Sequence, residues 1–209
     1  MTLIADSQID AALLPYGLES SPALNDKIRI YIALLLKWNR SISLTTVTEI
    51  DQILRFHFGE SLFALSLLPL EKGRLADVGS GAGFPGLALA AALPGLKTTL
   101  IESNGKKFAF LSEIIRELRL KNAVALRCRM EDVKGPDSHF DCITARALGQ
   151  FDDLLRWARR QLAPGGVVAL WLGEDDVQEL SKEESWSWHD PVQIPNSDRR
   201  FILVGTPKR

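Results

Sequence analysis

Cysteine and histidine are scarce in this sequence, and neither sign of charge predominates. Of the 209 residues, two are cysteines, Cys128 and Cys142, and three are histidines. Two cysteines cannot form a disulfide framework, and no four-ligand Cys/His cluster is present, so we expect a reducing cytoplasm and no metal. Lys and Arg total 25 against 26 Asp and Glu, and the resulting net charge of −1 does not by itself indicate a polyanionic partner.

Long apolar runs are also missing. Lys or Arg interrupts each stretch before it reaches the length of a transmembrane helix, about 18 residues. The N-terminus, MTLIADSQID, carries acids in place of the basic start of a signal peptide. We therefore expect a cytoplasmic protein that has no membrane partner. With 46% hydrophobic and 24% charged residues, the chain can bury the core of one large domain, or of one domain with an extension.

The first 72 residues have the pattern of a helical extension. Ser21-Pro22 can cap and open a helix whose apolar residues recur at three-to-four spacing as far as Asn39-Arg40. Thr48, with Asp51 three residues later, resembles a capping box. This box would begin a second helix, which Pro69 closes.

Residues 73–209 alternate short β-branched or aliphatic runs with helical patterns, which is typical of a parallel sheet covered on both faces. We predict an α/β, Rossmann-like domain with a seven-stranded, mostly parallel sheet whose C-terminal strand lies at an edge. The expected strands are near Leu75–Val78, Thr98–Ile101, Ala123–Leu126, Cys142–Thr144, Val167–Leu172, Trp186–Trp188 and Phe201–Val204, and the expected helices near Leu87–Leu93, Lys106–Leu118, Phe151–Gln161 and Asp176–Lys182.

A glycine-rich turn directly follows the first predicted strand. Its sequence is DVGSGAGFPG, residues 77–86, and glycines such as Gly79 and Gly81 let backbone N–H groups approach a ligand. A dinucleotide fingerprint requires glycine where Phe84 stands, and the Gly-Lys-Ser/Thr of a phosphate-binding loop does not follow. Phe84 thus speaks against the rival hypothesis of a nicotinamide dehydrogenase.

Two carboxylates flank this turn. Glu102 ends the second strand 23 residues after Gly79, where a carboxylate can accept both ribose hydroxyls of a nucleoside. Asp77 precedes the glycines, where it would repel a pyrophosphate but suits a ligand with an ammonium group. S-adenosylmethionine has both a ribose and an ammonium group. The alternative is that Asp77 and Glu102 are ordinary strand-end carboxylates beside a tight turn.

Several segments in order resemble the bacterial RsmG (GidB) family. They are VGSGAGFPG at 78–86, IESNGKK at 101–107, RMED at 129–132 and TARA at 144–147, preceded by Trp38-Asn39, Ser43-Leu44-Thr45, His57 and Glu60-Ser61. The resemblance covers roughly residues 35 to 175. It implies a class I methyltransferase fold, S-adenosylmethionine as cofactor, and methylation of N7 of one guanine in 16S ribosomal RNA. The implied partner is that RNA, the 30S subunit or an assembly intermediate, and no protein partner is inferred.

The resemblance also implies roles for individual residues. The departures from the family pattern are Ser43, where an Asn is common, and Leu172, where a Lys commonly precedes Gly173 and contacts RNA. In the implied site, Gly79 and Phe84 line the cofactor loop, Glu102 faces the ribose, and Met130 and Glu131 border the adenine. Arg146 lies between cofactor and target base and is expected to bind the cofactor as well as to orient the base.

The implied chemistry requires few catalytic groups. Guanine N7 has a free lone pair at neutral pH, so we expect in-line positioning without a general base. Arg146, ahead of Arg129, is the candidate to hydrogen-bond O6 while leaving N7 free. Cys128 and Cys142 lie inside strand patterns, where a small buried thiol is the commoner explanation than a nucleophile.

Local charge weakly supports an RNA partner. Residues 105–160 hold twelve basic and eight acidic side chains, whereas the remainder has a net charge of −5. The candidate RNA contacts are Lys106, Lys107, Arg129 and His57. Solvated helix faces explain most of these cations equally well, and a histidine on an apolar helix more often makes a structural hydrogen bond. Three alternatives therefore stay open, namely methylation of another RNA, methylation of a small molecule, and an RNA-binding module without activity.

Overall fold

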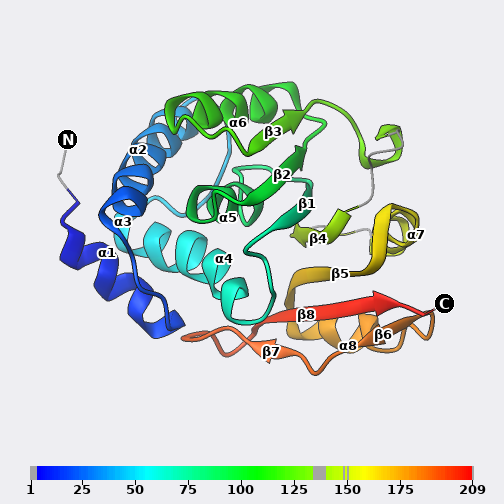
Figure 1. Cartoon of the computed structure of the whole chain (residues 1–209). Helices are drawn as coiled ribbons and strands as arrows, with labels where there is room; N and C mark the ends of the chain where they lie inside the picture. The colour runs from blue at the N-terminus through cyan, green and yellow to red at the C-terminus, as the bar shows by residue number, and fades with distance from the viewer. Residues whose placement is uncertain (1–3, 134–139, 148, 150, 209) are drawn as a thin grey trace.

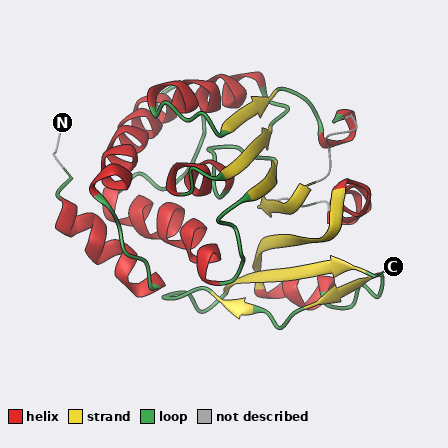
Figure 2. Ribbon diagram, in the orientation of Figure 1, coloured by secondary structure: helices red, strands yellow, loops and turns green. Residues whose placement is uncertain are grey.

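One mixed sheet runs through the molecule, and helices lie on both of its faces (Figures 1 and 2). The computed structural model describes residues 4–133, 140–147, 149 and 151–208. Along the sheet the order is β3-β2-β1-β4-β5-β8-β6, and β7 also pairs with β8. The strands are β1 (Gly73–Val78), β2 (Leu96–Ile101), β3 (Ala123–Leu126), β4 (Phe140–Arg146), β5 (Leu162–Gly173), β6 (Trp186–Trp188), β7 (Val192–Gln193) and β8 (Arg200–Pro207).

The five strands from β3 to β5 are parallel, and β8 is antiparallel to β5. The predicted mostly parallel α/β fold is therefore confirmed, with the two-residue strand β7 added to the seven strands expected. The prediction that the C-terminal strand lies at an edge is wrong, because β8 lies between β5 on one side and β6 and β7 on the other. A final strand can enter a sheet's interior when its neighbours are antiparallel, since no crossover helix is needed.

Alternating side chains of the central strands enter two separate hydrophobic cores. In β5, for example, Ala169 and Trp171 belong to the core on one face, whereas Val168 and Leu170 belong to the core on the other. This alternation follows from the two-residue period of a strand, and it makes the central strands apolar on both faces. Helices α5 (Gly86–Ala92) and α6 (Gly105–Glu117) cover the first face, and α7 (Phe151–Gln161) and α8 (Glu174–Leu180) cover the second.

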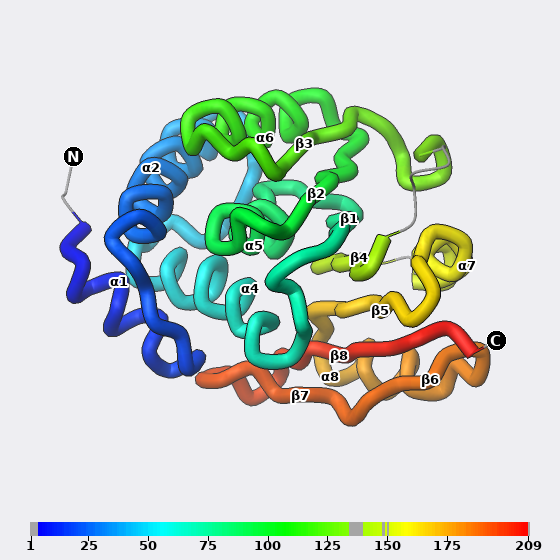
Figure 3. Tube along the Cα trace, in the orientation of Figure 1, coloured from blue at the N-terminus to red at the C-terminus, as the bar shows by residue number. Residues whose placement is uncertain are grey.

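Residues 4–72 lie on the same face as α5 and α6 (Figure 3). Their buried side chains and those of the sheet form one continuous core, so this extension is part of the structure that carries β1. Its elements are α1 (Asp6–Leu13), α2 (Pro22–Asn39), α3 (Ile50–Gln52), the π-helical segment Ile53–Gly59, α4 (Glu60–Leu62) and short 3-10 turns at Leu14–Tyr16 and Phe63–Ser66.

The ends of the N-terminal helices test two capping predictions. Ser21 caps α2 as expected, because its side chain accepts a hydrogen bond from the backbone N–H of Leu24. The capping box predicted at Thr48 and Asp51 is wrong, since α3 is preceded by Glu49 and has no side-chain cap. Among the described residues, no helix is both long and apolar enough to cross a membrane.

Candidate functional site

A cavity of about 380 Å³ opens at the carboxyl ends of β1 and β2, beside the segment that follows β3. Open α/β sheets bind ligands at this edge. The cavity thus combines three regions that were expected to hold a nucleoside, namely the glycine turn, the end of the second strand and the Arg-Met-Glu segment. Its lining residues are Val78, Gly79, Ile101, Glu102, Ser103, Cys128, Arg129, Met130 and Glu131.

Glu102 organises the glycine turn. Its carboxylate is 7% exposed, and Oε2 accepts a hydrogen bond from the backbone N–H of Gly81 at 2.9 Å, while Oε1 accepts one from Asn104 at 2.7 Å. Gly79 and Gly81 have φ values of +68° and +55°, which favour glycine. A carboxylate at the cavity wall, beside backbone that carries no Cβ, fits the ribose of a nucleoside.

Phe84 does not line this cavity, which corrects the role expected for its side chain. The ring is stacked between Tyr31 and His57, with centroid distances of 5.1 and 4.8 Å and interplanar angles of 16° and 19°. Phe58 meets it edge-on at 5.2 Å, and the Tyr31 hydroxyl donates a hydrogen bond to the carbonyl of Ala82 at 2.6 Å. The extension therefore contacts the glycine turn on the side that faces away from the cavity.

Asp77 also lies behind the turn and is not among the residues that line the cavity. Its side chain is 1% exposed, and Oδ1 accepts a hydrogen bond from the Thr144 hydroxyl at 2.7 Å. A Cβ at Gly86 would overlap the Asp77 side chain, so the start of α5 lies directly against it. Burial raises the pKa of Asp77 to about 6, against the opposing effect of the hydrogen bonds from Thr144, Ser80 and Gly86. The expectation of a carboxylate open to a ligand's ammonium group does not match this position.

Arg146 ends β4 and turns toward the extension. Its Nη2 donates to Oε2 of Glu60 at 2.8 Å, and its Nη1 donates to the carbonyl of Phe56 at 2.9 Å. The side chain is 21% exposed, and it is not among the residues that line the cavity. It lies at the same edge of the sheet as Val78, because Ala145 is paired with Val78 across β4 and β1.

His57 makes a structural hydrogen bond, the alternative to RNA contact given by the sequence. Its Nε2 lies 2.8 Å from the Thr45 hydroxyl, and its ring stacks on Phe84. Burial, together with the nearby charge of Arg146, lowers the pKa of His57 to about 4. The imidazole is therefore neutral at pH 7 and adds no positive charge for RNA.

The remaining RNA candidates occupy exposed or half-buried positions near the cavity. Arg129 lines the cavity and is exposed. Lys106 is exposed and Lys107 half-buried in the first turn of α6, where the Asn104 side chain accepts hydrogen bonds from both of their backbone N–H groups. Leu172, which stands where the family commonly has an RNA-contacting Lys, is 5% exposed and apolar, so it does not supply that contact.

Neither cysteine is fully exposed. Cys142 is buried, and Cys128 is half-buried at the cavity wall. Lys134, one of the twelve basic residues counted between positions 105 and 160, lies outside the described residues. In the part of the chain that the structure describes, no group of three or more His, Cys, Asp or Glu side chains is placed to hold a metal ion.

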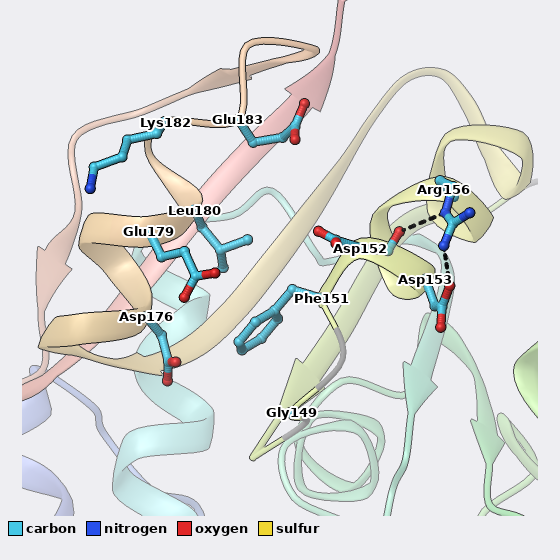
Figure 4. A pocket seen from close by; sticks show the side chains of 10 residues that line it. All are labelled: Gly149, Phe151, Asp152, Asp153, Arg156, Asp176, Glu179, Leu180, Lys182 and Glu183. Carbon is cyan, nitrogen blue, oxygen red and sulfur yellow. Dashed lines mark hydrogen bonds and ion pairs between the residues drawn. The ribbon is translucent and has the colours of Figure 1, made fainter.

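A larger cavity, of about 630 Å³, lies between α7 and α8 (Figure 4). Phe151 and Leu180 point into it, but five acidic and two basic side chains surround them, and one of the cations, Arg156, is paired with Asp153. An excess of carboxylates repels both phosphates and other anions. Size alone would favour this cavity, whereas chemistry favours the smaller one beside the glycine turn.

Three residues of the site were missed from the sequence. Tyr31 was indicated only as part of an apolar helix face, and Glu60 only as part of a family motif. Arg200, whose Nη2 lies 2.9 Å from Oε1 of Glu60, had no sequence signal beyond its basic character. The contacts that give these residues a role join segments far apart in the chain.

The shifted pKa values of His57 and Asp77 predict opposing effects of pH on stability. Between pH 6.5 and 4 the unfolded chain binds a proton at His57 that the folded chain does not, so the free energy of unfolding falls as pH falls. Between pH 3.8 and 6 the folded chain binds a proton at Asp77 that the unfolded chain does not, so that free energy falls as pH rises. Each effect is on the order of 3 kcal/mol, and in the intact protein the two largely offset each other.

Single substitutions should separate these two effects. Relative to the unchanged protein, His57→Gln should lose stability as pH rises from 4 to 6, and Asp77→Asn should gain it. Urea denaturation at pH 4, 5, 6 and 7 measures both slopes. Equal slopes in the unchanged protein and both variants would contradict the assigned burial of the two groups.

Comparison with known proteins adds a family match to this geometry. A family model described as GidB, rRNA small subunit methyltransferase G, matches residues 24–198. Ribosomal RNA small subunit methyltransferase G of Hydrogenovibrio crunogenus is 32% identical over 206 residues, covering 97% of this chain and 94% of that protein. The protein with that description from Coxiella burnetii is 38% identical over 195 residues, covering 92% and 94%.

Solved structures support the fold. A putative O-methyltransferase from Klebsiella pneumoniae has a TM-score of 0.65 at 14% identity and covers 96% of both chains. A ribosomal protein L11 methylase from Lactobacillus delbrueckii has a TM-score of 0.62 at 18% identity, covering 74% of this chain and 80% of that one. At these identities the likeness concerns the Rossmann-like methyltransferase fold alone.

Proposed function

The chain belongs to the GidB family, rRNA small subunit methyltransferase G, and from this premise we propose how its site methylates ribosomal RNA. It is an S-adenosylmethionine-dependent methyltransferase whose product is a guanine of 16S ribosomal RNA methylated at N7. The observation that carries the mechanism is the position of Arg146, at the same sheet edge as the nucleoside-sized cavity but turned toward the extension.

The cavity residues bind and orient the cofactor. We propose that Glu102 accepts hydrogen bonds from the ribose hydroxyls, that Gly79 and Gly81 allow close backbone approach, and that Met130 and Glu131 border the adenine. When bound, S-adenosylmethionine supplies an electrophilic methyl group on its sulfonium. Asp77 and Phe84 act indirectly, because they hold the turn from behind.

Arg146 orients the acceptor base. A planar guanidinium can donate to guanine O6 while N7 stays free, and N7 has a lone pair at neutral pH. The chain therefore needs no general base, and its contribution is to hold the acceptor in line with the methyl group. We further propose that residues 1–72 shape the acceptor side, since Glu60 and Phe56 of this extension hold Arg146.

The partner is 16S RNA, alone or within the 30S subunit or an assembly intermediate, and the place of action is the cytoplasm. Both proposals are supported by the family, and the RNA partner also by two exposed cations, Arg129 at the cavity wall and Lys106 at the start of α6. Methyl transfer from labelled S-adenosylmethionine to 16S RNA, with and without its ribosomal proteins, tests the RNA partner. Transfer to neither substrate, with transfer to another RNA or a small molecule, would contradict the proposed acceptor.

Charge reversal at the start of α6 tests the RNA face. We expect Lys106→Glu with Lys107→Glu to raise the KM for RNA roughly tenfold and to reduce the slope of log affinity against log salt, since phosphate contacts release counterions. The kcat and the cofactor affinity should stay unchanged, because neither side chain lines the cavity. As a control, Lys97→Glu removes an exposed cation from β2. An unchanged KM in the doubly substituted protein would show that RNA lies elsewhere.

A further inference from the structure

Glu60 is a buried carboxylate that holds two arginines. It is 1% exposed, on α4 of the N-terminal extension, and Oε2 accepts a hydrogen bond from Nη2 of Arg146 at 2.8 Å. Its other oxygen, Oε1, lies 2.9 Å from Nη2 of Arg200. One carboxylate thus joins the end of β4 to the start of β8.

The carboxylate is itself held in place. The indole N–H of Trp171 donates to the backbone carbonyl of Glu60 at 2.9 Å. Cross-strand pairs place Trp171 opposite Arg146, and Gly173 opposite Arg200. The three strand ends β4, β5 and β8 therefore converge on Glu60 at the carboxyl edge of the parallel strands.

Phe56 fixes the other side of both guanidinium groups. Its carbonyl accepts a hydrogen bond from Nη1 of Arg146 at 2.9 Å, and the guanidinium carbon of Arg200 lies 4.7 Å from the centre of its ring. Each arginine therefore has two anchors, one at Glu60 and one at Phe56. A guanidinium anchored at two points keeps its planar donor edge in one orientation.

Exposure and charge differ between the carboxylate and its partners. The side chains of Arg146 and Arg200 are 21% and 40% exposed, whereas that of Glu60 is 1% exposed. The cluster has one negative and two positive charges, so it presents positive charge outward. Burial raises the pKa of Glu60, and the charges of the two arginines oppose this rise. Buried ion pairs seldom add much stability, so stability alone does not account for this cluster.

We propose that Glu60 is a positioning residue that orients Arg146 toward the acceptor guanine, and that Arg200 is a second acceptor-side residue that contacts an RNA phosphate. This inference rests on the proposed function. It makes the N-terminal extension part of the acceptor site through a single side chain. The two arginines then have different roles: Arg146 recognises the guanine base, and Arg200 contacts the RNA phosphate backbone.

A double-mutant cycle tests the role of Glu60. Glu60→Gln should lower kcat about 100-fold, the size of effect that a misplaced acceptor produces. Its cofactor affinity should stay within about twofold, because Glu60 does not line the cofactor cavity. If Glu60 acts through Arg146, then Glu60→Gln combined with Arg146→Ala should be no slower than Arg146→Ala alone. Losses that multiply in the double variant would overturn the positioning role.

A conservative variant separates the positioning role from a folding defect. Glu60→Asp keeps the charge but withdraws it by one methylene, so we expect kcat to fall with the thermal midpoint nearly unchanged.

A second variant tests the phosphate contact of Arg200. Arg200→Gln leaves the pair of Glu60 and Arg146 intact and should raise the KM for RNA about tenfold with kcat unchanged. Full kcat in Glu60→Asp overturns the positioning role, and an unchanged KM in Arg200→Gln overturns the phosphate contact.

Glu113 offers a matched control. Its Oε2 accepts a hydrogen bond from the indole N–H of Trp38 at 2.7 Å, so Glu113→Gln also alters a carboxylate that joins the extension to the domain. This variant should keep both kcat and KM. Methyl transfer by the unchanged protein is the reference for all variants. Its failure would contradict the proposed function itself, whereas failure confined to the predictions for Glu60 and Arg200 would contradict this inference alone.

Discussion

Arg146→Ala should lower methyl transfer to 16S RNA by about 100-fold or more, the typical cost of removing a preorganised donor at a reacting group. Cofactor affinity, measured by calorimetry, should change little, because Arg146 does not line the cofactor cavity. Arg146→Lys should recover only a small part of the activity, since an ammonium keeps the charge but loses the planar pair of donors.

The matched control for this prediction is Arg116→Ala. Arg116 is an exposed arginine of α6 that is paired with its neighbour Glu117 at 2.7 Å. Its removal should leave both activity and cofactor affinity unchanged. If Arg146→Ala retained full activity while binding cofactor normally, Arg129, at the cavity wall, would become the candidate for orienting the base.

Phe84→Ala should reduce the free energy of unfolding by about 3 to 5 kcal/mol, the usual cost of truncating a buried aromatic side chain. The ring is 8% exposed and stacked between Tyr31 and His57. Because these contacts hold the glycine turn against the extension, the same variant should also weaken cofactor binding. Urea denaturation and calorimetry measure the two effects separately.

Phe140→Ala distinguishes loss of stability from loss of the turn's position. Phe140 is 5% exposed in the core on the opposite face, where it packs against Trp157. It should lose similar stability but keep its cofactor affinity in the folded protein. Equal cofactor affinity in Phe84→Ala and Phe140→Ala would show that the turn holds its shape without the stacked rings.

The elements of the α/β domain could be predicted because their signals are local. The strand Ala123–Leu126 and the helix Phe151–Gln161 have the predicted bounds, since each combines a clear hydrophobic period with nearby turn residues. The position of the last strand could not be predicted in this way, because strand order depends on which partners meet after folding. The π-helical segment Ile53–Gly59 likewise has no signature distinct from an α-helix in its apolar spacing.

In the site, too, the positions of residues could be predicted, whereas the directions of their side chains could not. Gly79 and Glu102 were predictable because a strand-turn-helix motif places them at a sheet edge. The direction of a side chain was not, so Asp77 and Phe84 were expected to face a ligand but lie behind the turn. The contact of Glu60 with Arg200 joins the N-terminal extension to the last strand, and a pair so far apart in the chain has no pattern in a single sequence.

The net charge of the whole chain does not reveal the charge around the site. The value of −1 averages acidic ends with a more basic region around the site. Of the candidate RNA contacts, Lys106 and Arg129 are the exposed ones, so we expect RNA affinity to fall with salt but with a small slope. Modest charge suits an enzyme that must release its product.

Cleavage of 16S RNA at the modified guanine tests the central claim most directly. Borohydride and aniline break RNA chains at 7-methylguanine. In a bacterium that lacks its own enzyme of this family, expression of this chain should restore the cleavage, and expression of Arg146→Ala at the same level should not. Absence of cleavage with the unchanged chain present and folded would contradict methylation of guanine N7 in 16S RNA.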